Sequence, residues 1–340
     1  MPPTTPPRPL DIEAEFPDLA GYRGTSTRLH PRPGTPGPDQ SSVGGPFLWP
    51  DGEPWPVCTE PHPRDRGRRI EDVHEERRVS AAAWSRGDGG PTEEERAVLA
   101  GLEREHRIPG LGDTDPVPLL PVAQLFARDV PGLVVPEGRD LLQVLWCPFG
   151  AHDGQAAPGV HLRWRTAAAC VPFPDPPRPA VVGDEGYVPE PCVLDPERVT
   201  EHQWAELLPE ELRLRIAEWE EALWEEADEN GDDGDDALSY DADFAVAPGW
   251  KAGGFARWGV TGPQELVCSC GSPMRLLLAV GSAEWEGVRG SWRPLEEAAS
   301  AGADETAART PTRVVVGRGG SLLVFVCSAD PAHEHRVSLQ

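Results

Sequence analysis

Two stretches of the chain carry the same short motifs in the same order, and this internal repeat limits the possible folds more than any other feature. The apolar runs in these motifs are six or seven residues long and are bounded by glycine, proline or polar residues, which is typical of β-strands. We therefore predict an α+β protein in which two β-rich, pseudo-symmetric repeats pack as one body. The first repeat contains GGPFLW (44–49), PLLPVAQL (118–125) and LLQVLWC (141–147), and the second contains GGFARW (253–258), PMRLLLAV (273–280) and SLLVFVC (321–327).

The repeat also divides the chain into segments. The 340 residues include 40 prolines and 36 glycines, so long loops and insertions are expected between short elements. A flexible, proline-rich arm is predicted over 1–42, in which a short element near Phe16 to Tyr22 can dock, and the first repeat over 43–195 with a helical insertion at 63–117. An acidic helix and a disordered loop are expected over 196–248. The second repeat then covers 249–340.

Two helices are expected in the segments that interrupt or separate the repeats. Residues 92–106 begin with Thr92 and Glu95 in capping-box spacing. A longer, acidic helix is expected from about Glu210 to Glu229, because its apolar residues recur at helical spacing. The residues expected to face the core are Leu212, Ile216, Trp219, Leu223 and Trp224.

The net charge of −26 makes several classes of partner improbable. A surface of this sign repels polyanions, so nucleic acids and anionic membranes are not expected to bind. A protein partner, if there is one, is expected to be basic. The sequence shows no apolar run of the length of a signal peptide or a membrane span, which favours a cytoplasmic location. The seven cysteines would stay reduced there, so metal binding or burial explains them better than disulfides.

The second repeat carries cysteine and histidine residues that suit a structural zinc ion. Thiolates and imidazoles, supplied in pairs by two turns, are the ligands that tetrahedral zinc prefers. Both thiols of the CSC motif reach one ion only if the chain turns at Gly271. The alternative is that the cysteines are small core residues beside surface histidines. The candidate ligands are Cys268, Cys270, Cys327, His333 and His335, of which one histidine need not bind.

The first repeat offers a second set, whose spacing is looser. If the two loops converge, this set makes another zinc site with two cysteines and two histidines. Three of its positions correspond to positions of the set in the second repeat. This is consistent with a metal motif that was duplicated together with the rest of the repeat. The four residues are Cys58, His62, Cys147 and His152, whereas Cys170 and Cys192 fall outside the pattern and are assigned to packing.

These motifs resemble the YwqG-like family, a domain of unknown function. The resemblance rests on GGPFLWPDGEPWPVC, PLLPVAQL, DLLQVLWC, PGWKAGGFARWG, CSCGSPMRLLLAV and GGSLLVFVC, and it spans most of 43–340. It implies a bacterial, cytoplasmic protein with an α+β fold that is built from an internal duplication. It implies no catalytic residues, and the CSC pair and the long insertions depart from simpler members.

The sequence favours a binding or protein-interaction module, of the kind that inhibitors or immunity proteins represent, over an enzyme. It contains no G-x-S-x-G, H-E-x-x-H or P-loop motif. The alternative is a zinc-dependent, hydrolase-like enzyme that acts in a groove between the repeats, in which three protein ligands and a water would hold the ion. Six tryptophans near the repeated motifs are read as core residues, with an interaction surface as the alternative; they are Trp49, Trp55, Trp146, Trp164, Trp250 and Trp258.

Overall fold

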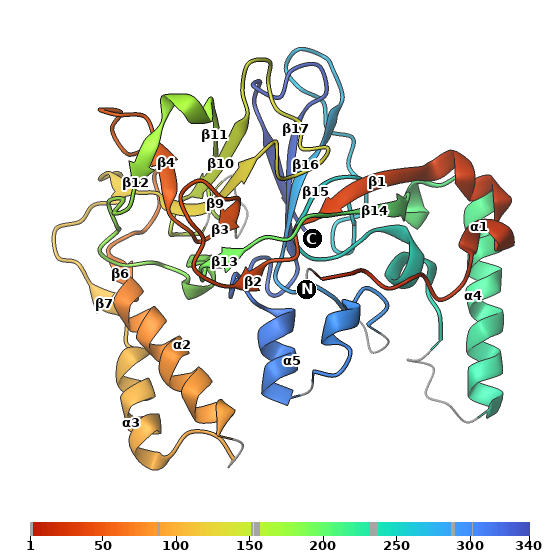
Figure 1. Cartoon of the computed structure of the whole chain (residues 1–340), viewed down its shortest axis with the longest axis horizontal. Coiled ribbons are helices and arrows are strands. Elements are labelled where there is room, and N and C mark those ends of the chain that lie inside the picture. Colours follow the sequence, from red (N-terminus) through yellow and green to blue (C-terminus); the bar gives the residue numbers. More distant parts are fainter. Residues whose placement is uncertain are drawn as a thin grey trace.

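The computed structural model describes residues 3–86, 89–150, 152, 157–230, 237–286, 290–300 and 302–340. The protein combines helices with antiparallel sheets and is of the α+β class (Figure 1). Two six-stranded sheets lie at its centre. The first has the strand order β14 (Glu197–His202), β1 (Arg23–Arg28), β15 (Lys251–Gly253), β16 (Met274–Gly281), β17 (Ser321–Cys327) and β18 (Arg336–Leu339). The second has the order β2 (Arg32–Pro33), β13 (Cys192–Val193), β3 (Ser42–Val43), β9 (Leu120–Phe126), β10 (Leu141–Trp146) and β11 (Val160–Arg165).

Two of the three repeated motifs, those of β9 and β10 and of β16 and β17, occupy corresponding places in the two sheets, whereas GGPFLW forms β4 outside them. The order β15-β16-β17-β18 in the first sheet corresponds to β3-β9-β10-β11 in the second. The β16–β17 pair has a register shift between Leu276 and Leu278, and the β9–β10 pair has one between Val144 and Leu145. The outer strands link the sheets, because the chain passes from β1 to β2 and later from β13 to β14.

One apolar core joins the two sheets. Val122 and Val144 of the second sheet lie in the same buried cluster as Leu278 and Val324 of the first. Removal of these side chains from water is the main favourable contribution to folding, so each sheet stabilises the other. The tryptophans noted in the sequence belong to the interior, since Trp49, Trp55, Trp146, Trp250 and Trp258 are buried and Trp164 packs against the shared core.

The prediction of a flexible arm over 1–42 is wrong for residues 3–42. This segment forms α1 (Ile12–Glu15), a 3₁₀ turn η1 (Pro17–Tyr22) and β1, which pairs with both β14 and β15. The side chains of Ile12, Phe16 and Leu19 are buried in a second apolar cluster. The segment lacks apolar periodicity because β1, with the sequence RGTSTR, is held by backbone hydrogen bonds on both sides rather than by an apolar face.

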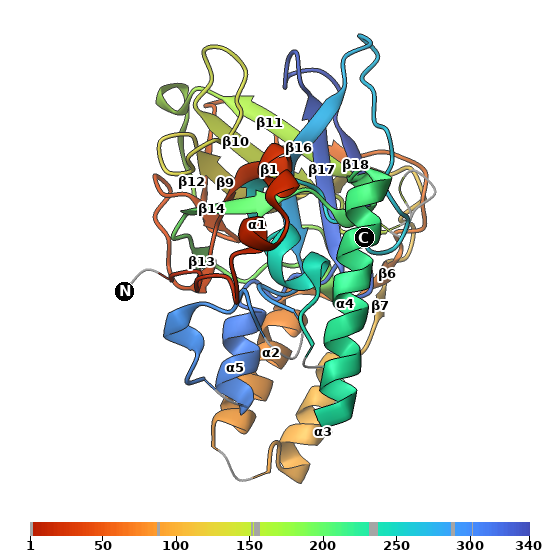
Figure 2. The same cartoon turned by 90° about the vertical axis from the view of Figure 1, so that its right-hand side faces the viewer.

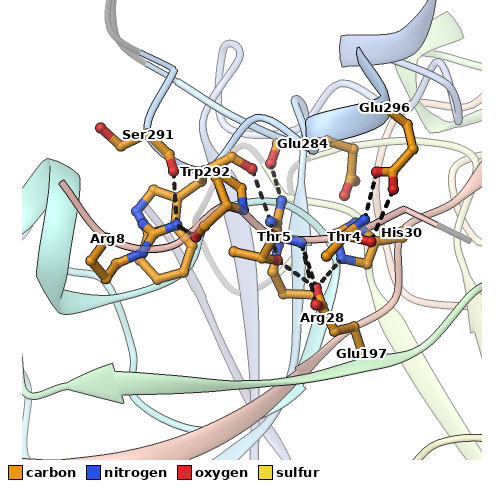
Figure 3. A network of polar contacts seen from close by, with 11 residues as sticks. Thr4, Thr5, Arg8, Arg28, His30, Glu197, Glu284, Ser291, Trp292 and Glu296 are labelled. Carbon is orange, nitrogen blue, oxygen red and sulfur yellow. Dashed lines mark hydrogen bonds and ion pairs between the residues drawn. The ribbon is translucent and has the colours of Figure 1, made fainter. Parts of the chain in front are cut away.

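Polar contacts hold the first residues of the chain against the first sheet (Figure 3). The Thr5 amide donates a hydrogen bond to Glu197 Oε2 at 3.0 Å, and Arg28 Nη1 donates one to Thr5 Oγ1 at 2.9 Å. The guanidinium of Arg28 is fully buried and also donates to the backbone carbonyl of Trp292 at 2.9 Å. The guanidinium of Arg8 lies 3.7 Å from the centre of the Trp292 ring. Residues 3–8 are therefore a packed part of the fold.

The longer helices extend from one side of the sheets, as both views show (Figures 1 and 2). Helices α2 (Ile70–Ser85) and α3 (Glu93–Leu102) lie in the expected insertion, and α5 (Gly302–Arg309) lies in the second repeat. The predicted capping box of α3 is confirmed, because Thr92 Oγ1 accepts from the Glu95 amide and the Glu95 carboxylate accepts from the Thr92 amide. Among the described residues, no helix is long and apolar enough to cross a membrane.

Helix α4 (Glu210–Asn230) occupies the range expected for the acidic helix. Leu212 and Ile216 are buried, and Trp219 packs against the same cluster. The expectation that Trp224 faces the core is wrong, since 60% of this residue is exposed. At about 3.6 residues per turn, Trp224 lies about 120° around the helix from Leu212, so its side chain points away from the apolar cluster. The expected disordered loop falls largely on 231–236, which lie outside the described residues.

Shorter elements complete the fold. Three two-stranded sheets pair β4 with β12, β5 with β8, and β6 with β7. The strand bounds are β4 Phe47–Trp49, β5 Val57–Cys58, β6 Arg66–Gly67, β7 His106–Arg107, β8 Val117–Pro118 and β12 Val171–Phe173. The short helical turns are η2 Ala167–Ala169, η3 Glu185–Tyr187, η4 Ala205–Leu207, η6 Tyr240–Ala245 and η7 Leu295–Glu297.

Candidate metal centres

The fold brings eight of the nine candidate ligands into two clusters. In each cluster one potential ligand atom per residue lies within 4.8 Å of all the others. Each cluster could therefore hold a metal ion. We call the cluster in the first repeat centre 1 and the cluster in the second repeat centre 2. Centre 1 consists of Cys58, His62, Cys147 and His152, and centre 2 consists of Cys268, Cys270, Cys327 and His333.

Equivalent strands position the two centres. Cys147 directly follows β10, and Cys327 is the last residue of β17, the strand that stands in the corresponding place in the other sheet. Cys58 ends β5, whose pairing with β8 fixes the start of the loop that carries His62. Both centres thus lie beyond the carboxyl ends of corresponding central strands.

The predicted turn of the CSC motif is present in centre 2. The amide of Gly271 donates to the Cys268 carbonyl at 2.8 Å, and the Cys268 amide donates to the Ser272 carbonyl at 2.9 Å. Gly271 has a φ of 86°, a conformation that residues with a Cβ atom adopt only at a cost. The turn places the sulfur of Cys270 3.5 Å from that of Cys327.

The separations between ligand atoms suit a tetrahedral zinc ion. Usual bond lengths to zinc place sulfur and nitrogen on neighbouring corners about 3.6 Å apart, and two sulfurs about 3.8 Å apart. In centre 1, His62 Nε2 lies 3.4 Å from the sulfurs of both Cys58 and Cys147. In centre 2, Cys268 Sγ lies 3.7 Å from His333 Nδ1. An ion therefore fits either centre with only small side-chain movements.

Both histidines of centre 1 point one ring nitrogen at the cluster and use the other for an orienting hydrogen bond. The Nδ1 atom of His62 lies 3.1 Å from the carbonyl oxygen of Pro63, and that of His152 lies 2.8 Å from a carboxylate oxygen of Glu60. Such outer contacts are usual for histidines that bind a metal. The remaining His152 nitrogen, Nε2, is buried without a hydrogen-bond partner. A bound metal ion would satisfy this atom.

The buried side chain of Arg64 fixes the loop that carries two ligands of centre 1. Its guanidinium is fully buried and donates to the backbone carbonyls of Cys58 at 3.0 Å and His62 at 3.3 Å, and also to that of Glu60. All of these bonds go to backbone carbonyls, so together they hold the loop in one conformation. The sequence contains no signal for Arg64 or Glu60, since each is one of many arginines or acidic residues in the chain.

Contacts within centre 1 shift the pKa values of its two thiols in opposite directions. A hydrogen bond from Cys147 lowers the pKa of the Cys58 thiol to about 3, and the same interaction raises the pKa of Cys147. The Cys58 thiolate raises the pKa of His152. The neighbours of Cys58 therefore favour its thiolate form, which is the form that binds a metal.

Centre 2 is more accessible to solvent. Cys268 and Cys327 are buried, but Cys270 and His333 are exposed. Hydrogen bonds from Ser272 lower the pKa of the Cys270 thiol to about 6, and the backbone amides of Asp330 and Ala329 lower that of Cys327. Contacts within their own loops thus favour the thiolate form of two of the three cysteines.

The remaining candidate histidine and the two remaining cysteines lie elsewhere. His335 is the candidate ligand outside centre 2, and its Nε2 atom lies 3.0 Å from the carbonyl oxygen of Val160 in the other repeat. Of the two histidines that the sequence left open, His333 is the one beside the thiols. Cys192 is fully buried in the shared core, and Cys170 packs against a small apolar cluster, as the packing assignment expects. No protein-family model matches the chain, and a search of curated proteins found no match either.

Proposed function

We propose that centres 1 and 2 each bind one structural zinc ion. The observation that supports this most directly is the clustering of two thiols and two imidazoles, one ligand atom of each within 4.8 Å of all the others, which includes the buried ring of His152. Four soft or borderline ligands leave no open position for water, as expected of a structural rather than a catalytic zinc. The chain has seven free cysteines, which supports a reducing, cytoplasmic location.

The two centres are proposed to be products of one internal duplication. The matching strand orders and the two central register shifts support this origin, as does the position of both centres beyond β10 and β17. The resemblance of the motifs to the YwqG-like family fits the same proposal. In this arrangement each zinc ion ties the loops at one end of its own repeat, so the protein depends on metal for its stability.

The body held by these centres is proposed to serve as a protein-binding module, with helix α4 as its contact surface. Leu214 and Trp224 are exposed by 54% and 60%, and neither lies on the face of α4 that carries the buried Leu212 and Ile216. They are separated by about 15 Å along the helix axis. An exposed tryptophan is a typical anchor for a partner.

The charge of α4 specifies a basic partner. Glu221 and Glu225 are one turn apart and repel each other, and the last turn contains no basic residue that would balance the negative end of the helix dipole. A cationic surface placed against this helix would relieve both effects and attract the partner over long distances. We propose a partner whose arginine or lysine residues surround an apolar patch that receives Trp224.

Metal analysis tests the zinc proposal. Protein purified without added chelator should contain about two zinc ions per chain, with X-ray absorption showing a mixture of sulfur and nitrogen ligands. The variant Cys147→Ser should retain one ion, and Cys170→Ser, which alters a cysteine outside both centres, should retain two. Protein that contains no tightly bound metal, or that binds a metal with oxygen ligands only, would refute the proposal.

The binding proposal is tested with two equally exposed tryptophans. Trp224→Ala on α4 should abolish recovery of a partner, whereas Trp84→Ala on α2, where Trp84 is 56% exposed, should not. The recovered partner should be basic, and its affinity should fall steeply with salt. Equal recovery by both variants, or an acidic partner, would contradict the assignment of α4.

A further inference from the structure

The two centres differ in the access of solvent to their sulfur atoms. Cys58 and Cys147 of centre 1 are 2% and 0% exposed, and its histidines are 4% exposed. In centre 2, Cys270 is exposed on a turn, and 41% of the His333 side chain is accessible. A small molecule in solution can therefore reach a thiolate of centre 2 without any opening of the fold.

A second thiol lies within reach of the exposed one. The sulfurs of Cys270 and Cys327 are 3.5 Å apart, although 57 positions separate the residues in sequence. Cys327 ends β17 and is fully buried, so it is fixed by the sheet. Cys270 lies in the turn closed by Gly271, where rotation about its side-chain bonds can bring the two sulfurs to bonding distance.

We propose that centre 2 is a site of reversible thiol oxidation by hydroperoxides, at which a Cys270–Cys327 disulfide forms and the metal ion leaves. This inference rests on the proposed binding of zinc. Three thiolates around Zn²⁺ give centre 2 a net charge of −1, whereas two thiolates give centre 1 a net charge of zero. The excess negative charge and the exposure both make the sulfurs of centre 2 the better nucleophiles.

The proposed oxidation needs no oxidant other than the peroxide. The Cys270 thiolate attacks the peroxide, the O–O bond breaks, and a sulfenic acid and hydroxide form. The Cys327 thiolate then attacks this sulfur and displaces a second hydroxide, which completes the disulfide. Two thiolates thus lose two electrons, the peroxide gains them, and two protons from the buffered solution convert the hydroxides to water. The zinc ion keeps only Cys268 and His333, and is released. A dithiol reductant returns both thiols and allows zinc to rebind.

The test uses the full-length, zinc-loaded protein and hydrogen peroxide. Zinc release is followed with a chromogenic chelator, and disulfides are mapped by mass spectrometry of peptides from quenched samples. We expect one of two zinc ions to leave faster than the other by on the order of tenfold or more, together with formation of a Cys270–Cys327 disulfide. Reductant and zinc should restore the starting state, and Cys170→Ser should behave like the wild type.

Three outcomes would overturn the inference. They are release of both ions at one rate, release from centre 1 first, and loss of zinc without a Cys270–Cys327 disulfide. Zinc content is measured before oxidation, and each outcome is read only on protein that starts with two zinc ions, so each leaves the proposed function intact. Protein that holds no zinc before oxidation would refute the proposed function itself. Because the disulfide is mapped in the wild type, the result does not depend on a variant that folds poorly.

Discussion

Centre 1 and centre 2 occupy corresponding places in the two sheets, yet one is buried and the other lies at the surface. With zinc bound, the two thiolates of centre 1 cancel the charge of the ion, which suits its burial among Leu145, Phe149 and other residues of an apolar cluster. Centre 2 has a third thiolate in place of an imidazole. Its excess negative charge is tolerable because Cys270 and His333 contact solvent. The comparison suggests that burial selects the ligand set.

The largest expected difference concerns the cost of losing each centre. Cys147→Ser removes a ligand of centre 1. It also leaves a hydroxyl group in a buried apolar cluster, where no water compensates for it. We expect it to lower the free energy of unfolding by about 4 kcal/mol or more, against about 1–2 kcal/mol for Cys270→Ser. Chemical denaturation with metal analysis of each variant measures both values. Equal losses would show that burial does not distinguish the centres.

A pH titration tests whether the metal centres are independent of Glu284, a buried acid beyond the other end of β16. Burial raises the pKa of Glu284 to about 7, whereas the same group titrates near 4.5 in a model compound. As the pH rises, Glu284 therefore loses its proton at a lower pH in the unfolded chain than in the folded protein. The wild type loses up to about 3 kcal/mol of stability as the pH rises from 4.5 to 7.

Glu284→Gln should abolish this loss, so its stability relative to the wild type should increase between pH 4 and pH 8. Unfolding curves at several pH values measure the effect, and zinc content at neutral pH is the control. If the variant instead changes the zinc content, Glu284 and the centres are coupled, and the two regions cannot be compared independently.

The carboxylates that lie beside the histidine ligands provide a finer comparison of the metal affinities of the two centres. Glu60 lies 2.8 Å from the buried His152, whereas Asp330 lies 3.9 Å from the exposed His333. Glu60→Gln should weaken zinc binding at centre 1 by about 10–100-fold, and Asp330→Asn should weaken binding at centre 2 by less. Competition with a chelator of known affinity measures both. A larger effect at Asp330 would mean that the hydrogen bond of Glu60 does not orient His152.

The smallest expected effect concerns the turn of centre 2. Gly271→Ala places a Cβ atom on a residue with a φ of 86°, which should cost about 1 kcal/mol and weaken zinc binding at centre 2 only. Gly52→Ala is the matched control, since Gly52 has a φ of 73° and also has open space around it. The control should cost similar stability without a change in zinc affinity. Weaker zinc binding in both variants would assign the effect to the whole fold rather than to the turn.

Much of the candidate site could be predicted because its information is local. Cys268, Cys270 and Gly271 are adjacent in sequence, so the need for a turn between the thiols followed from their spacing. The capping box of Thr92 and Glu95 is local in the same way. Strand β1 could not be found by these means, because its residues are polar and are held by pairing with strands more than 150 positions away.

The sequence by itself determined which residue types were available to bind a metal and the order in which the strands present them. Only the tertiary structure decided that His333 rather than His335 joins the thiols, that Glu60 orients His152, and that centre 1 is buried while centre 2 is open. The reason is that ligand chemistry is a property of each side chain, whereas burial and long-range pairing depend on how the two sheets pack.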